Sequence, residues 1–203
     1  MTVIENPLLL RKKAVSGDFQ IERSLRFNRG DSAYLLKTFD QGDETAFTVS
    51  FWVKRTEIGG SNELEILHAA DGSGPRSFIG FNNNNNDRLH IGFNPTGSSW
   101  FYVKTERMFR DTGAWISVVV AVDTKQDVNT DRVKLYINGI RETTFSQYDT
   151  ITQNLKTNIN ADIATAIGRY QHGSGSNYLN GYLADFYFID GLQNCISLLI
   201  QPI

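Results

Sequence analysis

Short stretches in which apolar and polar residues alternate recur along most of the chain. The clearest runs from Phe47 to Arg55, where Phe47, Val49, Phe51 and Val53 are separated by single residues. Because successive side chains of a β-strand point to opposite faces, this alternation predicts a strand with one buried face. Similar stretches predict strands over residues 24–28, 33–36, 65–69, 77–81, 88–93, 100–103, 115–123, 132–137, 165–169 and 181–189.

The segments between these stretches carry turn residues. The run Asn82–Asp87 joins two predicted strands, and Asn138-Gly139 is typical of a two-residue hairpin turn. The chain has 17 glycines against 4 prolines, which favours strands joined by tight turns. No stretch shows the apolar period of an amphipathic helix. We therefore predict an all-β fold, a two-sheet antiparallel jelly-roll sandwich.

The predicted sandwich domain occupies residues 23–191 and leaves a segment at each end. Residues 1–22 are predicted to form an N-terminal arm and residues 192–203 a C-terminal tail. The arm is either a frayed terminus or a part that docks on a partner. The tail is either a truncation or a strand that pairs with a neighbour. For docking, the expected assembly anchors are the apolar residues Leu8, Leu9, Leu10, Leu198, Leu199 and Ile200.

Charge and cysteine content exclude several classes of protein. The formal net charge is -2, so no global field attracts the chain to nucleic acid or to an anionic membrane. No run approaches the roughly 18 apolar residues of a transmembrane helix. The basic triplet Arg11–Lys13 follows the first apolar cluster, the reverse of a secretion signal. Cys195 is the only cysteine and cannot form an internal disulfide. We expect synthesis in the cytoplasm, with neither nucleic acid nor membrane as a partner.

Several strand motifs occur in an order known from one superfamily. In chain order they are Ser24–Phe27, Asp31–Leu35, Phe47–Arg55, Val133–Gly139 and Leu179–Gly191. Together they resemble the laminin-G-like, concanavalin-A-like jelly-roll superfamily. Within it, they resemble the branch found in structural proteins of tailed bacteriophages of marine and cyanobacterial hosts. The segment after Gly191 departs from that pattern, because such phage proteins usually continue into a longer C-terminal stretch.

The resemblance implies a virion structural protein without enzymatic activity. A chain of 203 residues leaves little length for a fibre shaft, so the expected role is a capsid decoration protein or a small appendage that presents a lectin-like domain. Its implied location is the virion of a phage made in the host cytoplasm. Its implied partners are capsid or tail proteins and further copies of itself. The alternative is a carbohydrate-binding module that recognises a host surface polysaccharide.

Candidate catalytic groups are few. Glycosidases of this fold carry carboxylates along one strand. Glu63 and Glu65 point the same way, but the further carboxylate expected near Leu67 or His68 is missing. We interpret the pair as part of a solvated strand face. No histidine accompanies a nucleophile motif such as Gly-x-Ser-x-Gly, so we predict no catalytic residues.

Oxygen ligands gather in one predicted loop. Asp123, Asp127, Asn129 and Asp131 lie between two predicted strands, and Ca²⁺ binds such oxygens. The same residue types are ordinary in turns. Both interpretations stay open: the sequence requires no cofactor, and a calcium site is the alternative.

Aromatic residues beside polar loops are the best candidates for sugar binding. A pyranose stacks on a flat aromatic ring while polar side chains bind its hydroxyl groups. The candidates near predicted loops are Trp100, Tyr102, Tyr170, His172, Asn177 and Tyr178.

Overall fold

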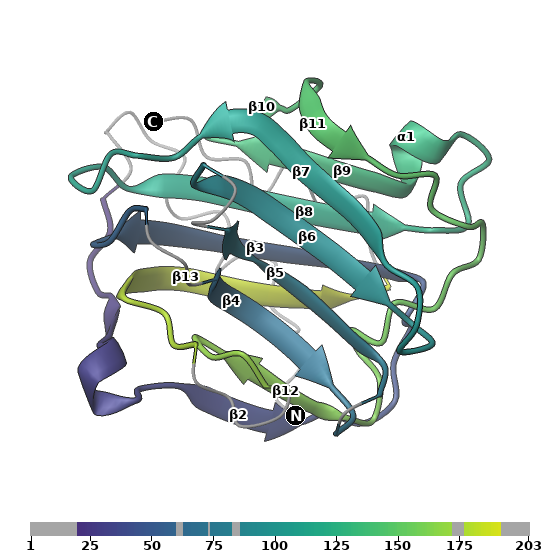
Figure 1. Ribbon diagram of the computed structural model, residues 1–203, viewed down its shortest axis with the longest axis horizontal. Helices are drawn as coiled ribbons and strands as arrows, with labels where there is room; N and C mark the ends of the chain where they lie inside the picture. The colour runs from purple at the N-terminus through teal and green to yellow at the C-terminus, as the bar shows by residue number, and fades with distance from the viewer. Residues whose placement is uncertain (1–19, 60–62, 73, 83–85, 172–176, 192–203) are drawn as a thin grey trace, which may run out of the picture.

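The computed structural model of the chain describes residues 20–59, 63–72, 74–82, 86–171 and 177–191. Its strands form two sheets that lie one over the other (Figure 1). The strands are β1 (Leu25–Phe27), β2 (Leu35–Thr38), β3 (Ala46–Arg55), β4 (Glu63–Ala70), β5 (Arg76–Asn82), β6 (Arg88–Asn94), β7 (Phe101–Met108), β8 (Ile116–Asp123), β9 (Val133–Ile137), β10 (Ile140–Arg141), β11 (Phe145–Tyr148), β12 (Ala164–Ile167) and β13 (Gly181–Asp190). Two short helical segments accompany them, η1 (Arg29–Asp31) and α1 (Asn129–Arg132).

Each sheet combines strands from distant parts of the chain. Sheet A has the order β1-β13-β3-β8-β9-β10, and sheet B has the order β11-β7-β6-β5-β4-β12-β2. Neighbouring strands are antiparallel throughout. The structure therefore confirms the predicted all-β, two-sheet antiparallel sandwich.

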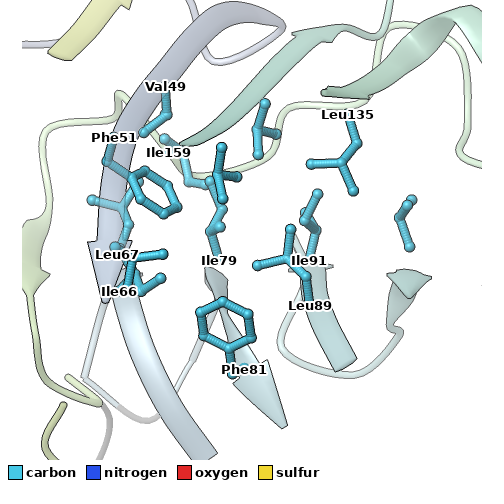
Figure 2. Packing of buried hydrophobic residues seen from close by; sticks show 14 of the residues in the cluster. Val49, Phe51, Ile66, Leu67, Ile79, Phe81, Leu89, Ile91, Leu135 and Ile159 are labelled. Atoms are coloured by element: carbon cyan, nitrogen blue, oxygen red, sulfur yellow. The ribbon is translucent and has the colours of Figure 1, made fainter. Parts of the chain in front are cut away.

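The core lies between the two sheets. The alternation predicted for β3 is confirmed, because Phe47, Val49, Phe51 and Val53 are each 0% exposed. Full burial of a side chain of this size stabilises the fold by roughly 1.5–3 kcal/mol. Figure 2 shows part of this packing, with labels on Val49, Phe51, Ile66, Leu67, Ile79, Phe81, Leu89, Ile91, Leu135 and Ile159.

A β-bulge in β4 changes which residues face the core. The pairing of β4 with β5 shifts between Glu65 and Leu67, and both Ile66 and Leu67 belong to the core. An extra residue in one strand reverses the alternation beyond it. His68 therefore lies on the same outer face as Glu65, whereas a regular strand would place the two on opposite faces.

The apolar pattern missed one edge strand of each sheet. It predicted neither β10 nor β11, although it did predict β1 and β2 at the opposite edges of sheets A and B. It also ended the strand at 100–103, although β7 continues to Met108. An edge strand has a neighbour on one side only and is short. Its residues therefore bury less side-chain surface, and the apolar alternation is weak.

A buried ion pair ties the end of β3 to the turn between β5 and β6. Arg55 is 0% exposed and Asp87 is 2% exposed. The guanidinium lies 2.8 Å from Asp87 Oδ1, donates to the carbonyl of Phe109, and has its Cζ 4.7 Å from the ring centroid of Phe81. Asp87 also accepts a hydrogen bond from the backbone N–H of Gly59 and pairs with the exposed Arg110 at 3.3 Å. Removing Arg55 leaves the buried carboxylate without its only buried counter-charge among the described residues.

We predict that Arg55→Met lowers the free energy of unfolding by about 3–5 kcal/mol, the cost typical of breaking a buried pair. Chemical denaturation monitored by tryptophan fluorescence measures it. The double variant Arg55→Met/Asp87→Asn should be less destabilised than the single variant, because both charges are then gone.

Arg29→Met is the matched control. It removes an ion pair with Glu57 whose side chains are 26% and 27% exposed. Such a pair contributes about 0–1 kcal/mol. Equal losses for Arg55→Met and Arg29→Met would contradict the importance given to burial.

Candidate functional site

Polar and aromatic side chains gather on the outer face of sheet B, on strands β4 to β7. Two rows of residues aligned by strand register cross this surface: Tyr102–Gly92–Phe78–His68 and Lys104–His90–Gly80–Glu65. We define the β4–β7 face by these rows together with Glu63, Arg76, Asn94, Trp100 and Tyr170.

Two glycines at the centre of the β4–β7 face leave room for neighbouring side chains. A Cβ atom at Gly92 would lie 2.6 Å from Phe78 Cε1 and 3.0 Å from Trp100 Cζ3. A Cβ at Gly80 would lie 2.7 Å from Glu65 Oε2. These distances are shorter than van der Waals contact, so the rings and the carboxyl group occupy the space above the glycines.

An aromatic cluster is built around Phe78. Its ring centroid lies 5.6 Å from that of Trp100, 4.8 Å from that of His90 and 6.2 Å from that of His68. The ring of His90 is also 4.9 Å from the ring of Tyr102. These separations are typical of favourable aromatic pairs. The cluster gives the face a rigid, largely apolar framework.

Two cations flank the exposed part of that cluster. The rings of Trp100 and Tyr102 are stacked, with centroids 5.2 Å apart and planes 8° from parallel. Arg76 Cζ lies 5.0 Å from the Trp100 ring centroid, and Lys104 Nζ lies 4.4 Å from that of Tyr102. All four side chains are partly exposed. They therefore combine flat apolar surface with hydrogen-bond donors at the edge of the face.

Glu65 is buried beneath this surface, with 1% of the residue exposed. Neither carboxyl oxygen has a hydrogen-bond partner in the part of the chain that the structure describes. Burial raises the pKa of Glu65 well above 4.5, and the nearby charge of Glu63 raises it further. The predicted solvated strand face is therefore wrong for Glu65. Alternation along β4 could not reveal the aromatic side chains that neighbouring strands bring to the same face.

His90 and Asn94 are also buried on the β4–β7 face. They are 5% and 0% exposed. Neither ring nitrogen of His90 nor either amide atom of Asn94 has a hydrogen-bond partner among the residues that the structure describes. Burial, together with the charge of Lys104, lowers the pKa of His90 to about 3. His90 is therefore neutral at physiological pH.

Three of the predicted sugar-binding residues come together here. Trp100 and Tyr102 form the stacked pair, and the ring of Tyr170 lies 4.7 Å from that of His68. Tyr170 follows β12, and its backbone N–H donates to the carbonyl of Asn177. Whether these residues bind sugar remains a prediction.

The other predicted sugar-binding residues are not brought into the cluster. Tyr178 contacts a different group, with its ring centroid 6.1 Å from that of Tyr34 and 5.9 Å from Arg169 Cζ. The described hydrogen bond of Asn177 uses its backbone and not its side chain. His172 lies outside the described residues.

Sequence reasoning missed most of the β4–β7 face. It did not single out Arg76 or Phe78 as ligand contacts, and it assigned Glu65, His68 and His90 no binding role. One signal was present: Phe78 and His90 alternate with apolar core residues in two adjacent predicted strands. Their shared face became clear only from the register of β5 and β6.

The predicted calcium ligands make hydrogen bonds and ion pairs with other residues. These partners are Lys125 N–H and Gln126 for Asp123, Gln153 for Asp127, Ile151 N–H for Asn129, and Lys134 and Arg141 for Asp131. In the parts of the chain that the structure describes, no three His, Cys, Asp or Glu side chains form a group that could hold a metal ion. Calcium binding stays an untested prediction.

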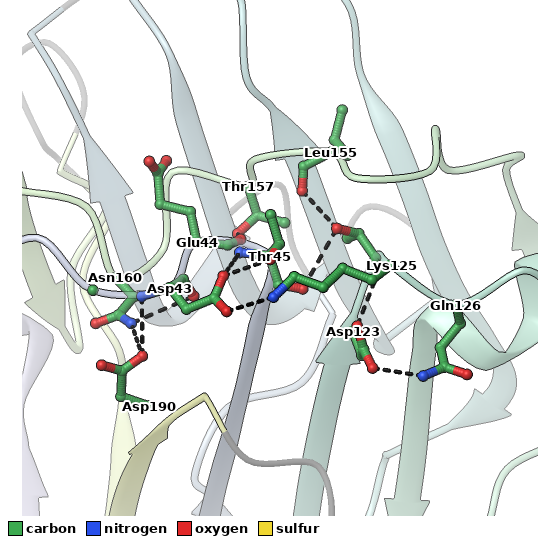
Figure 3. Close-up of polar contacts among 12 residues, drawn as sticks. Asp43, Glu44, Thr45, Asp123, Lys125, Gln126, Leu155, Thr157, Asn160 and Asp190 are labelled. Atoms are coloured by element: carbon green, nitrogen blue, oxygen red, sulfur yellow. Dashed lines mark hydrogen bonds and ion pairs between the residues drawn. The ribbon is translucent and has the colours of Figure 1, made fainter.

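A polar network at the rim of the sandwich includes Asp123 and is centred on Asp43 (Figure 3). Asp43 pairs with Lys125 at 2.8 Å and accepts hydrogen bonds from Thr45. Its backbone N–H donates to Asp190, which also accepts from the side chain of Asn160. Burial alone would raise the pKa of Asp43, but the hydrogen bonds from Lys125 and Thr45 outweigh it and lower that pKa from 3.8 to about 2.

A recess lies at the edge of the sandwich and has a volume of about 580 Å³. Most of its lining is apolar, including Leu25, Phe27, Leu35, Leu183 and Phe186. It lacks the concentration of hydrogen-bonding groups found on the β4–β7 face.

The predicted assembly anchors lie outside the described residues, in the segments 1–19 and 192–203. Among the residues that the structure does describe, no helix has the length and apolar character needed to cross a membrane.

Comparisons with known proteins identify the family. The family model Laminin_G_3, described as the concanavalin A-like lectin/glucanases superfamily, matches residues 28–192. No curated protein sequence matches the chain.

Several solved structures are similar at low sequence identity. A heptameric SAP-like pentraxin from Limulus polyphemus is 16% identical with a TM-score of 0.58, over 88% of this chain and 81% of the pentraxin. The CBM40 of a Ruminococcus gnavus IT-sialidase, bound to α2,3-sialyllactose, is 12% identical with a TM-score of 0.54, over 89% and 98%. Botulinum neurotoxin type C, whose cell entry depends on two ganglioside molecules, is 16% identical with a TM-score of 0.57, over 91% and 44%. At these identities the likeness shows the fold alone.

The rim network generates a pH prediction. The pKa of Asp43 is lowered in the folded state, so its contribution to stability is present above pH 4 and is lost as the pH falls toward 2. We expect Asp43→Asn to lower the free energy of unfolding at pH 7 by about 1 kcal/mol or less, because the pair is partly exposed and screened. Urea denaturation at pH 7 and at pH 2 measures the difference, which should shrink at the lower pH. An effect of Asp43→Asn that grows on acidification would contradict this assignment.

Proposed function

The chain belongs to the concanavalin A-like lectin/glucanases superfamily, and we propose that it is a carbohydrate-binding domain whose β4–β7 face holds the sugar. The proposal depends chiefly on the Trp100–Tyr102 pair, which is stacked, partly exposed and flanked by Arg76 and Lys104. Aromatic surface next to hydrogen-bond donors is the combination that sugar recognition needs.

A sugar would bind by taking the place of one cation. The outer ring faces of Trp100 and Tyr102 carry Arg76 and Lys104. A partly exposed cation–π contact contributes only about 0.5–1 kcal/mol, so a pyranose can displace a flexible side chain from the ring. The displaced guanidinium or ammonium group then remains close enough to donate hydrogen bonds to sugar hydroxyls.

We propose no catalytic step at this site. Glycoside hydrolysis needs an acid and a second carboxylate on either side of the scissile bond. After Glu63 and Glu65, the next residue of β4 on the outer face is His68, which is not a carboxylate. Its Nδ1 accepts a hydrogen bond from the backbone N–H of Gln171. Its ring is further held by Phe78 and Tyr170. We infer a packing role for His68.

The first test is an array of neutral and acidic oligosaccharides, followed by calorimetric titration of the strongest one. Trp100→Ala should weaken binding about 30-fold or more, since a central tryptophan commonly contributes at least about 2 kcal/mol. Binding should persist in EDTA, because the proposed contacts require no metal. Incubation with the oligosaccharide should release no reducing sugar.

Trp115→Ala is the matched control. Trp115 packs against Tyr182 of sheet A, with ring centroids 6.3 Å apart, so its removal should leave affinity unchanged. Equal affinities for Trp100→Ala and the parent protein would place the sugar elsewhere. Absence of binding to every oligosaccharide would oppose the carbohydrate function itself.

The virion role implied by the sequence resemblance is a separate proposal, compatible with sugar binding. In that role the chain would attach to capsid or tail proteins, in several copies, through residues 1–22 or 192–203. Deleting residues 1–22 should abolish cosedimentation with purified particles and leave oligosaccharide binding intact. Retained attachment after this deletion would exclude the arm as the anchor, and absence of the full chain from particles would overturn the role.

A further inference from the structure

Three buried polar side chains lie at the base of the β4–β7 face. Glu65, His90 and Asn94 are 1%, 5% and 0% exposed. Among the described residues, none of the carboxyl, imidazole or side-chain amide atoms that they carry has a hydrogen-bond partner. Buried polar atoms without partners are rare in native proteins and call for a physical explanation.

Two of these side chains approach the same point from opposite sides. Glu65 and His90 are both aligned with Gly80, on the strands that flank it. Adjacent strands are about 4.8 Å apart, so the two backbones are separated by roughly 10 Å. The carboxyl group of Glu65 extends into the space above Gly80, toward the strand that carries His90. The ring of Phe78 packs against His90 beside this row, with the two centroids 4.8 Å apart.

Burial favours the uncharged form of both groups. Burial and Glu63 raise the pKa of Glu65, while burial and Lys104 lower that of His90 to about 3. A protonated carboxyl group donates one hydrogen bond and accepts others, and a neutral imidazole does both. The titratable or charged groups that face Glu65 from the packed elements are Glu63, His68, Arg76, His90, Tyr102, Lys104 and Tyr170.

The charged groups at the edge of the face balance one another. Arg76 and Lys104 carry positive charge, and Glu63 and Asp149 carry negative charge that acts on Lys104 and Tyr102. The face therefore offers no excess positive charge to an anionic ligand.

Resting on the proposed carbohydrate function, we propose that Glu65 and His90 form a neutral polar base that hydrogen-bonds the hydroxyl groups of an uncharged sugar. Glu65 acts as a protonated carboxylic acid that donates to one hydroxyl, and His90 accepts from or donates to another. Asn94 is aligned with Arg76, four residues along β6 from His90, and lies outside this base. A sugar hydroxyl can satisfy such groups because it is both a donor and an acceptor, whereas a carboxylate or sulfate is an acceptor only.

Within this proposal, Tyr170 is the side chain that moves to give access to the base. The polar atoms are closed to solvent in the ligand-free protein, so a side chain must move before a sugar reaches them. The ring of Tyr170 lies against His68, and its phenol is close enough for the charges of Glu63 and Glu65 to raise its pKa, after burial as the main cause. Rotation of this partly exposed side chain opens the base.

The test uses the strongest neutral oligosaccharide from the array, titrated between pH 4 and pH 9. Affinity of the parent protein should be constant at low pH and then fall by up to tenfold per pH unit between the pKa of Glu65 in the free protein and its higher pKa in the complex. Glu65→Gln, which resembles the protonated acid, should keep the low-pH affinity and lose the pH dependence. Glu65→Leu removes the donor and should weaken binding at least tenfold.

Glu106→Gln is the control for loss of a carboxylate from sheet B. Its side chain is 53% exposed and pairs with Arg88, so the pH profile should match that of the parent. Tyr170→Ala should speed association with the neutral oligosaccharide. Circular dichroism at each pH confirms that the variants are folded.

The outcomes separate this inference from the proposed function. Two outcomes would overturn the neutral base and leave the carbohydrate function standing. One is binding to acidic sugars alone that depends on Trp100. The other is an affinity for neutral sugars that changes neither with pH nor in Glu65→Leu. In either case the buried groups hold only ordered water. Loss of all oligosaccharide binding in the parent protein would overturn both.

Discussion

The β4–β7 face depends on the absence of side chains at Gly80 and Gly92, in the two central strands of sheet B. A methyl group at either position would overlap atoms that lie flat on the sheet: Phe78 and Trp100 above Gly92, and Glu65 above Gly80. Because glycine has no Cβ, the rings approach the backbone closely and form one layer. The stacking of Trp100 on Tyr102 and the burial of His90 both follow from this layer.

The β4–β7 face also depends on the bulge in β4. It lets Ile66 and Leu67 both enter the core while His68 joins Glu65 on the outer face. One inserted residue thus satisfies the core and brings two titratable side chains to the same surface. Bulges are over-represented beside functional sites because they redirect side chains without ending the strand.

Stability and binding make opposite demands on this sheet. Its inner face is closely packed and apolar, whereas its outer face buries polar atoms that have no partner among the described residues. Each such atom costs roughly 1–3 kcal/mol when no hydrogen bond replaces water. The core contacts of β4 to β7 offset that cost. A fold shared at 12–16% identity with a pentraxin, a sialidase module and a neurotoxin does not specify a ligand, so the function must be argued from this face.

The sequence by itself determined the all-β class, most of the strands and the inward face of β3, because alternation is a local property and burial of every second residue leaves a direct trace in it. It also singled out Trp100, Tyr102 and Tyr170 through their position near loops. It could not show that these rings meet Phe78 and His68, since strands far apart in the chain become neighbours only through sheet register. The burial of Glu65 and Arg55 was hidden for the same reason: a charged residue looks solvated until the tertiary structure places other strands around it. Local pattern decides which way a side chain points, and only the packing of distant strands decides what it meets there.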